Sequence, residues 1–95
     1  MTASDLTIRA LITGRVQGVG YRAWAAGEAR RLRLSGWVRN RREGSVEAVF
    51  AGPAETIDRM LAACRQGPPS ALVSNVEVSE RPEPIGPDFR VLPTA

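Results

Sequence analysis

Hydrophobic and polar positions alternate near the start of the chain, and the period then changes. Leu6, Ile8, Ala10 and Ile12 alternate with mostly polar neighbours, which predicts a strand with one buried face. From residue 21 the apolar side chains recur every three or four positions. This spacing predicts an amphipathic helix that extends to about Leu34.

A hairpin and a second helix are predicted downstream. Residues 36–40 and 46–50 are short β-prone segments on either side of a glycine-containing connection, as in a hairpin. A second apolar stripe at helical spacing follows, with Pro53 expected at its first position, where the missing N–H costs nothing. The Gly-Pro-Pro sequence at residues 67–69 then ends this helix.

The remaining chain predicts a fourth strand over residues 73–78, a loop over 82–87 and a short strand over 89–92. The order βαββαβ plus a short terminal strand predicts an α+β, ferredoxin-like sandwich. We therefore expect one domain over residues 1–95, with an antiparallel sheet and two helices on one face. This fold hosts many activities, so it does not itself predict a function.

Composition narrows the chemistry. The 95 residues are 43% hydrophobic, which excludes a disordered chain. One cysteine, Cys64, excludes a disulfide framework and a multi-cysteine metal site, and its place on an apolar stripe predicts a buried structural thiol. Histidine is absent, which removes the commonest metal ligand and general base. An enzyme with this composition must work without either.

The start of the chain and the lack of a long apolar run predict a cytoplasmic protein. All thirteen basic residues are arginine, yet the net charge of +3 is far from the dense positive footprint of a dedicated nucleic-acid binder. No apolar run approaches the ~20 residues of a membrane span. The first residues lack the basic and apolar regions of a secretory signal.

The most informative segment is GRVQGVGYR at residues 14–22, between the first predicted strand and the first helix. Glycines there allow backbone N–H groups to turn inward, and the start of the helix adds unpaired donors and a positive dipole end. Arg22 adds a planar fork that matches two phosphate oxygens. The segment is therefore either a site for a small dianion or a glycine-rich turn with a solvated arginine.

Two named phosphate motifs do not fit this segment. A Walker loop ends in Gly-Lys-Ser/Thr, and the chain contains no lysine. Residues 18–23 match the loose G-x-G-x-x-A pattern, but a dinucleotide fold needs a parallel sheet and an acidic residue ~20 positions later. Asn40 stands near that place, and the predicted hairpin contradicts the topology.

A second segment surrounds Asn40. Strand alternation places Val38 and Asn40 on one face, and Trp37 and Arg39 on the other. A carboxamide beside a sheet can orient a water molecule without carrying a charge. Asparagine is also common where a strand enters a turn, so both interpretations of Asn40 stay open on spacing alone.

Taken together, the two segments resemble the paired signatures of the acylphosphatases. The first is GRVQGVGYR at residues 14–22, and the second is GWVRNRREGSVE at residues 36–47. The resemblance runs from about residue 6 to residue 78. It departs at Leu32-Arg33-Leu34, where many relatives have Leu-Gly-Leu, so the chain lacks a glycine that could form a left-handed cap at the end of the first helix.

The resemblance implies hydrolysis of the carboxyl–phosphate bond of small acyl phosphates, without metal or cofactor. It assigns phosphate binding to Arg22 and orientation of the attacking water to Asn40. It also implies a ferredoxin-like fold and a small-molecule substrate, and we expect a monomer that binds neither nucleic acid nor membrane. The substrate-binding residues are expected in the loop: Arg15, Val16, Gln17, Gly18, Val19, Gly20 and Tyr21.

Two other function classes are compatible with a ferredoxin-like fold. Ferredoxin-like sheets include RNA-binding modules, but the strands offer only Trp37 and Phe50 instead of the aromatic motif of such modules. A regulatory domain that senses phosphate would share the loop without needing Asn40. Arg41 and Arg42, in the hairpin turn, are either solvated or steer anionic substrates toward the site.

Overall fold

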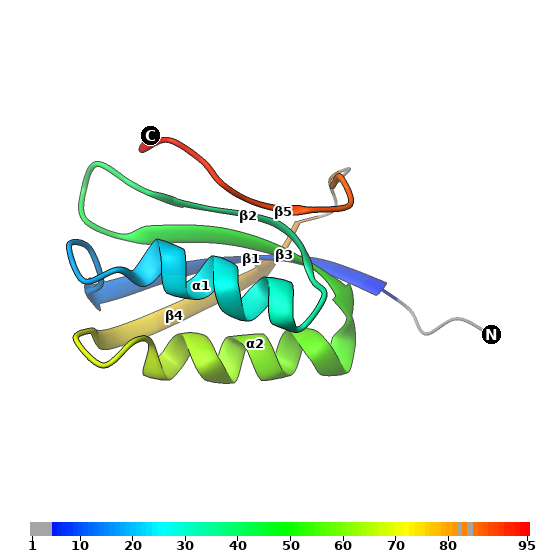
Figure 1. Ribbon diagram of the computed structural model, residues 1–95, viewed down its shortest axis with the longest axis horizontal. Coiled ribbons are helices and arrows are strands. Elements are labelled where there is room, and N and C mark those ends of the chain that lie inside the picture. Colours follow the sequence, from blue (N-terminus) through cyan, green and yellow to red (C-terminus); the bar gives the residue numbers. More distant parts are fainter. Residues whose placement is uncertain (1–4, 82, 84) are drawn as a thin grey trace.

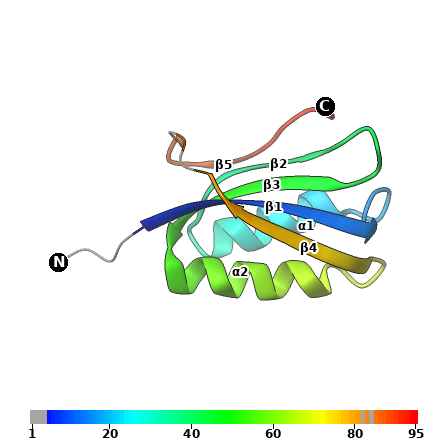
Figure 2. The same ribbon diagram turned by 180° about the vertical axis from the view of Figure 1, so that it is seen from behind.

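The computed structural model describes residues 5–81, 83 and 85–95, and Figure 1 shows their arrangement. Both helices lie on one face of the sheet, and the opposite face carries no helix (Figures 1 and 2). In chain order the elements are β1 (Asp5–Arg15), α1 (Tyr21–Arg31), β2 (Ser35–Asn40), β3 (Val46–Pro53), α2 (Ala54–Gln66), β4 (Leu72–Glu80) and β5 (Phe89–Val91).

The five strands lie in the order β4-β1-β3-β2-β5. The ferredoxin-like sandwich is confirmed, but the sheet is mixed, whereas an antiparallel sheet was expected. The pairs β1–β3, β1–β4 and β2–β3 are antiparallel, whereas β5 runs parallel to β2. The chain crosses to the far edge of the sheet after β4 and enters β5 from the end at which β2 begins, so β5 follows the direction of β2.

The core lies between the sheet and the two helices, as the hydrophobic periods predict. Ile8, Ala10 and Ile12 are buried and face the helices from β1. Similar alternation in β2 and β3 directs Val38 and Phe50 to the same side. Each helix contributes a buried stripe of side chains at helical spacing: Tyr21, Ala25, Ala26 and Ala29 from α1, and Ile57, Met60, Leu61 and Cys64 from α2.

Helix α1 ends at Arg31, three residues before the predicted end near Leu34. Arg33 adopts a left-handed conformation with φ of 60°, which no helix can continue. The Leu34 N–H donates to the Ala29 carbonyl over 2.9 Å, and the Arg33 N–H donates to the Arg30 carbonyl over 3.0 Å. These two bonds form a Schellman motif, in which glycine is the usual residue at the left-handed position. Arginine therefore occupies a backbone conformation that disfavours it.

The other element boundaries differ from the predictions by a few residues. Pro53 is the N-cap of α2 instead of its first helical residue, and β4 is longer than predicted at both ends. Strand β5 ends one residue early, at Val91. The predicted loop over residues 82–87 has no helix or strand at residues 83 and 85–87, and residues 82 and 84 lie outside the described residues.

One carboxylate organises the sheet face that the helices leave open. Glu47 is only 2% exposed, and its Oε2 accepts a hydrogen bond from Arg9 Nε over 2.6 Å while its Oε1 accepts one from Arg39 Nε over 2.8 Å. Arg41 Nη1 lies 3.3 Å from Oε1, and Arg81 Nη1 lies 3.8 Å from Oε2. Arginines from β1, from β2, from the turn after β2 and from the chain after β4 thus converge on a single residue of β3.

Arg9 and Arg39 outweigh the cost of burying this charge. Burial by itself raises the pKa of Glu47, but the hydrogen bonds and positive charges of Arg9 and Arg39 lower the pKa below its ordinary value.

Within the described residues no helix is long and apolar enough to span a membrane.

We predict that Arg33→Gly stabilises the protein. Glycine adopts the left-handed conformation without the steric cost that arginine carries, so we expect a gain of about 0.5–1 kcal/mol in the free energy of unfolding. Urea denaturation measures it, with Arg33→Ala as the control that removes the side chain but keeps the strain. An equal gain in both variants would contradict the conformational explanation.

We predict that Glu47→Gln lowers stability at neutral pH by roughly 1–3 kcal/mol, because it leaves several partly exposed arginines without their shared carboxylate. The folded protein holds the pKa of Glu47 below that of the unfolded chain. The unfolded chain therefore takes up the proton first as pH falls. The stability that Glu47 provides is thus complete above the unfolded pKa, near 4.5, and is lost as pH falls through the folded pKa.

Urea denaturation at pH 7 and at successively lower pH measures both the loss of stability at neutral pH and its dependence on pH. Glu47→Gln should lose less stability on acidification than the wild type does. The exposed Glu77 of β4 provides the matched control, and Glu77→Gln should follow the wild-type profile. Parallel acid profiles for the wild type and Glu47→Gln would contradict the role of this carboxylate.

Candidate active site

The two signature segments meet at one end of the molecule. The loop of residues 16–20 joins β1 to α1, and the turn of residues 41–45 joins β2 to β3. Both connections lie at the left-hand end of the sandwich in Figure 1. Because β2 is antiparallel to β3, and β3 is antiparallel to β1, strands β1 and β2 run in the same direction. Their C-terminal ends therefore lie at the same end of the sheet.

Two glycines allow the loop to enter the helix abruptly. Gly18 and Gly20 have φ of 74° and 79°, in the left-handed region that other residues rarely adopt. Gly20 is the N-cap of α1, has no side chain to satisfy the first amides, and is followed by no acidic residue in the first turn. The first N–H groups of a helix have no partner within it, so this turn presents free donors beside its positive dipole end.

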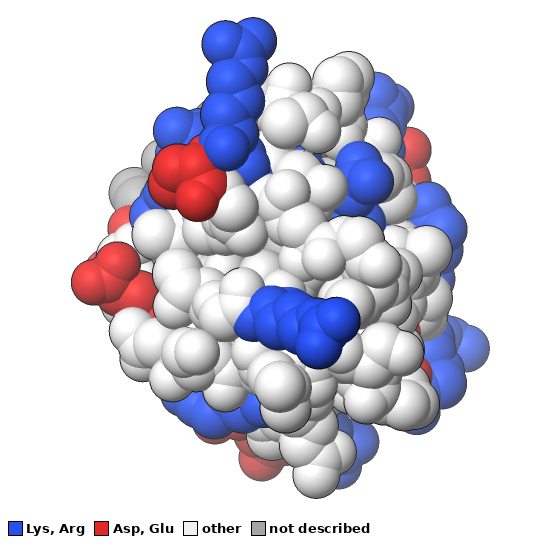
Figure 3. Space-filling model, turned by 90° about the vertical axis from the view of Figure 1, so that its left-hand side faces the viewer, with Lys and Arg blue, Asp and Glu red and all other residues white. Residues whose placement is uncertain are grey.

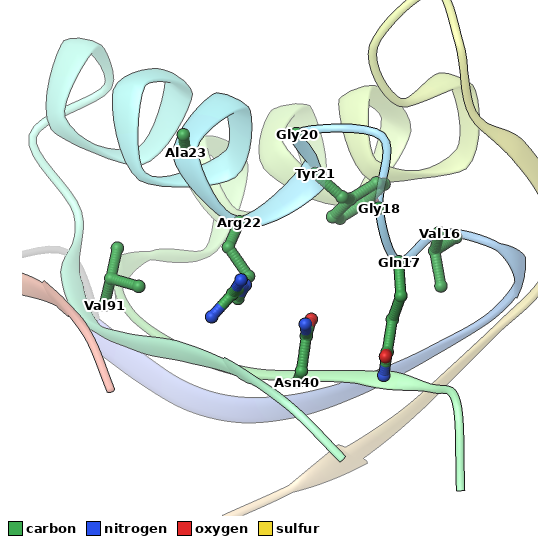
Figure 4. Close-up of a pocket in the computed structure, with 9 residues that line it drawn as sticks. All are labelled: Val16, Gln17, Gly18, Gly20, Tyr21, Arg22, Ala23, Asn40 and Val91. Carbon is green, nitrogen blue, oxygen red and sulfur yellow. The ribbon is translucent and has the colours of Figure 1, made fainter. Parts of the chain in front are cut away.

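Arg22 and Asn40 face each other below these donors. Figure 4 shows Arg22 pointing from α1 toward β2, and Asn40 pointing from the end of β2 toward α1. The partly buried Arg22 has no ion pair or side-chain hydrogen bond among the described residues. The Asn40 Oδ1 atom is buried and has no hydrogen-bond partner there either. A buried acceptor without a donor is costly, and a bound water or ligand would relieve that cost.

Both side chains line one pocket of about 300 Å³. The pocket brings together most of the predicted site residues, with the glycine loop on one side and the sheet on the other (Figure 4). Arg15 and Val19 are the predicted residues that do not line it; Arg15 is exposed at the end of β1, and Val19 packs against the core. The lining residues are Val16, Gln17, Gly18, Gly20, Tyr21, Arg22, Ala23, Asn40 and Val91.

Two of the predicted substrate-binding residues can offer only their backbone to a ligand. Val16 and Tyr21 are 1% and 2% exposed, because their side chains belong to the core. The Tyr21 hydroxyl donates to the Cys64 carbonyl over 2.7 Å, and burial raises the pKa of this tyrosine. Burial also raises the pKa of Cys64 to about 11, so the thiol stays protonated and structural, as its position on the apolar stripe predicts.

Sequence reasoning missed Val91 and Ala23. Ala23 follows Arg22 in the first turn of α1, so the predicted helix contained a signal for it. Val91 comes from β5, which lies beside β2 with Val38 as its partner. No local pattern links residue 91 to residue 40. The chain after β5 continues along the same edge, where the Ala95 N–H donates to the Asn40 carbonyl over 3.0 Å.

The electrostatics of this end suit an anion. Figure 3 faces it and shows a largely uncharged surface with separate basic side chains, whereas acidic side chains lie toward its margin. Among the described residues, no three His, Cys, Asp or Glu side chains gather in a group that could hold a metal ion. The arrangement can therefore bind a tetrahedral oxyanion through amides and one guanidinium, and can orient a neighbouring neutral molecule through an amide side chain.

Fold and pocket together define a small ferredoxin-like α+β protein with an uncapped helix start, a guanidinium and a carboxamide at one pocket. The family model described as acylphosphatase matches residues 8–91. An acylphosphatase of Azorhizobium caulinodans is 57% identical over 90 residues, covering 93% of this chain and 96% of that protein. This chain belongs to the acylphosphatase family.

Solved structures agree with this assignment. An acylphosphatase structure from Coxiella burnetii superimposes with a TM-score of 0.89 at 38% identity, and covers 93% of each chain. The crystal structure of acylphosphatase from Bacillus subtilis gives a TM-score of 0.86 at 35% identity, covering 92% of this chain and 98% of that one. The family that the two segments resembled is thereby confirmed, together with the expected activity, hydrolysis of acyl phosphates.

Proposed function

We propose that the pocket between the glycine loop and the end of β2 is the active site for acyl phosphate hydrolysis. The observation that carries the proposal is the pairing of Arg22 with Asn40 across this pocket. Among the described residues, Arg22 has no counter-ion and the buried Asn40 Oδ1 atom has no hydrogen-bond donor. A phosphate dianion and a water molecule would complete both at once.

The phosphoryl group binds to the loop and to Arg22. Amide donors at the start of α1 and the positive end of the helix dipole face the negative oxygens. The guanidinium adds two parallel N–H donors and a positive charge. As the bond to the acyl oxygen breaks, charge spreads over the phosphoryl oxygens, and these preorganised donors stabilise it.

Asn40 orients the attacking water. Its Oδ1 atom accepts a hydrogen bond from the water and directs the water oxygen toward phosphorus, on the side opposite the acyl group. A phosphate oxygen of the substrate takes the proton of this water. The leaving carboxylate has a conjugate acid with a pKa near ~4, so it departs without a general acid. The site therefore requires neither histidine nor a protein-borne base.

Replacement of Asn40 by alanine should lower kcat by about 100-fold or more, because the water loses its orientation. Binding of inorganic phosphate should change little, since the loop and Arg22 stay in place. The measurement is hydrolysis of acetyl phosphate with phosphate as a competitive inhibitor, and a chelator is present throughout. A variant that keeps wild-type kcat would remove Asn40 from the mechanism.

Replacement of Arg22 by alanine should instead weaken both phosphate binding and turnover. Loss of the guanidinium should raise the inhibition constant of phosphate about 10-fold or more and should also lower kcat/KM. The exposed Arg65 of α2 offers a matched control, and Arg65→Ala should match the wild type in both measurements. If phosphate inhibited Arg22→Ala as strongly as the wild type, the anion would have to bind elsewhere.

A further inference from the structure

We propose that the Gln17 side chain is a positioning residue that sets the distance between the phosphate-binding loop and Asn40. This inference rests on the proposed function of the pocket. It also refines the expectation that Gln17 binds substrate, because the side-chain N–H groups of Gln17 are directed to the protein itself.

The Gln17 amide connects the two signature segments directly. Its Nε2 atom donates to the Arg41 carbonyl over 2.7 Å and to the Ser45 carbonyl over 2.8 Å. Both N–H groups of the amide are therefore used, and neither remains for a substrate oxygen. Figure 4 shows the side chain extending from the loop toward the strand that carries Asn40.

These two bonds are the hydrogen bonds that join residues 16–20 to residues 41–45 in the described part of the chain. Asn40 immediately precedes Arg41, so one bond ends at the residue next to the water-binding side chain. Arg22 and the loop amides belong to the β1–α1 side of the pocket, whereas Asn40 belongs to the β2–β3 side. Gln17 is thus the link between the group that holds phosphate and the group that holds water.

The turn itself does not need Gln17 to keep its shape. The Gly44 N–H donates to the Arg41 carbonyl over 3.1 Å, and the Arg41 N–H donates to the Ser45 carbonyl over 2.8 Å. Each carbonyl that Gln17 contacts therefore keeps a backbone donor when the side chain is changed. Arg41 is also held by Glu47, from the opposite face of the sheet. Loss of the link should leave both segments folded and change mainly their separation.

A small change in separation has a large kinetic effect. A displacement of about 1 Å between reacting groups can cost on the order of 100-fold in rate. Phosphate affinity depends on the loop amides and Arg22, and the Gln17 side chain donates instead to the carbonyls of Arg41 and Ser45. A positioning role therefore predicts a loss in kcat with little change in phosphate binding, whereas a general loss of structure would lower both.

The test begins with Gln17→Met, which keeps the length of the side chain and removes both donors. We expect kcat for acetyl phosphate to fall about 10- to 100-fold. The inhibition constant of inorganic phosphate should stay within about threefold, and the unfolding temperature should fall by about 5 °C or less. Gln66→Met, at an exposed position near the end of α2, is the matched control and should behave as the wild type.

Gln17→Asn gives a second, more conservative measurement, which also applies if the methionine variant does not fold. Asparagine keeps the amide but is one methylene shorter, so it cannot reach both carbonyls. We expect a kcat between those of the wild type and the methionine variant, again with unchanged phosphate inhibition. A wild-type kcat in Gln17→Asn, or a loss of phosphate affinity equal to the loss of kcat, would overturn the proposal.

A double-mutant cycle separates this inference from the proposed function. If Gln17 acts through Asn40, adding Gln17→Met (or Gln17→Asn) to Asn40→Ala should lower kcat less than twofold further. If the two losses instead multiply, Gln17 acts on something other than Asn40 and the inference fails. If Asn40→Ala alone leaves kcat unchanged, it is the proposed role of Asn40 that fails.

Discussion

The passage from β1 into α1 is the constraint on which the site depends. The chain must leave a strand and begin a helix within residues 16–20, and the two left-handed glycines make this possible. The helix then starts on Gly20, whose lack of a side chain leaves the first amides without a cap. A helix start that the protein does not satisfy favours an external anion, since the free donors and the helix dipole act in the same direction.

The sheet supplies the second half of the site by placing β2 opposite this helix start. Its two faces have different tasks. The face toward the helices carries the core and, at the end of β2, Asn40. The other face carries Glu47 and the arginines that converge on it, including Arg39 and Arg41 on either side of Asn40. The charged network on the open face thus holds the segment that presents an uncharged amide to the pocket.

The chemistry of the pocket suits groups that do not change charge near neutral pH. Arginine supplies a positive charge and asparagine a neutral amide, so neither has to exchange a proton to act. The strongly raised pKa values of Tyr21 and Cys64 belong to side chains in the core beneath the loop. The raised pKa values of Tyr21 and Cys64 therefore mark packing, whereas the candidate site is marked by polar groups that have no partner among the described residues.

The sequence by itself determined the features that depend on neighbours along the chain. The alternation of Ile8, Ala10 and Ile12 specified the buried face of β1, helical spacing specified the two apolar stripes, and the glycines marked the loop before Arg22. Which face of a strand or helix a side chain occupies follows from the period of that element, so a local pattern predicts it. The paired signatures also specified the family.

The tertiary structure alone decided what depends on distant contacts. It placed Val91 in the pocket because β5 pairs with β2 in parallel, joined Gln17 to the carbonyls of the hairpin turn, and gathered four arginines around Glu47. It also placed Arg33 in a left-handed conformation, because α1 must end there for Leu34 to enter the core. None of these contacts has a periodic signal, since each joins residues whose approach depends on the packing of the whole sheet.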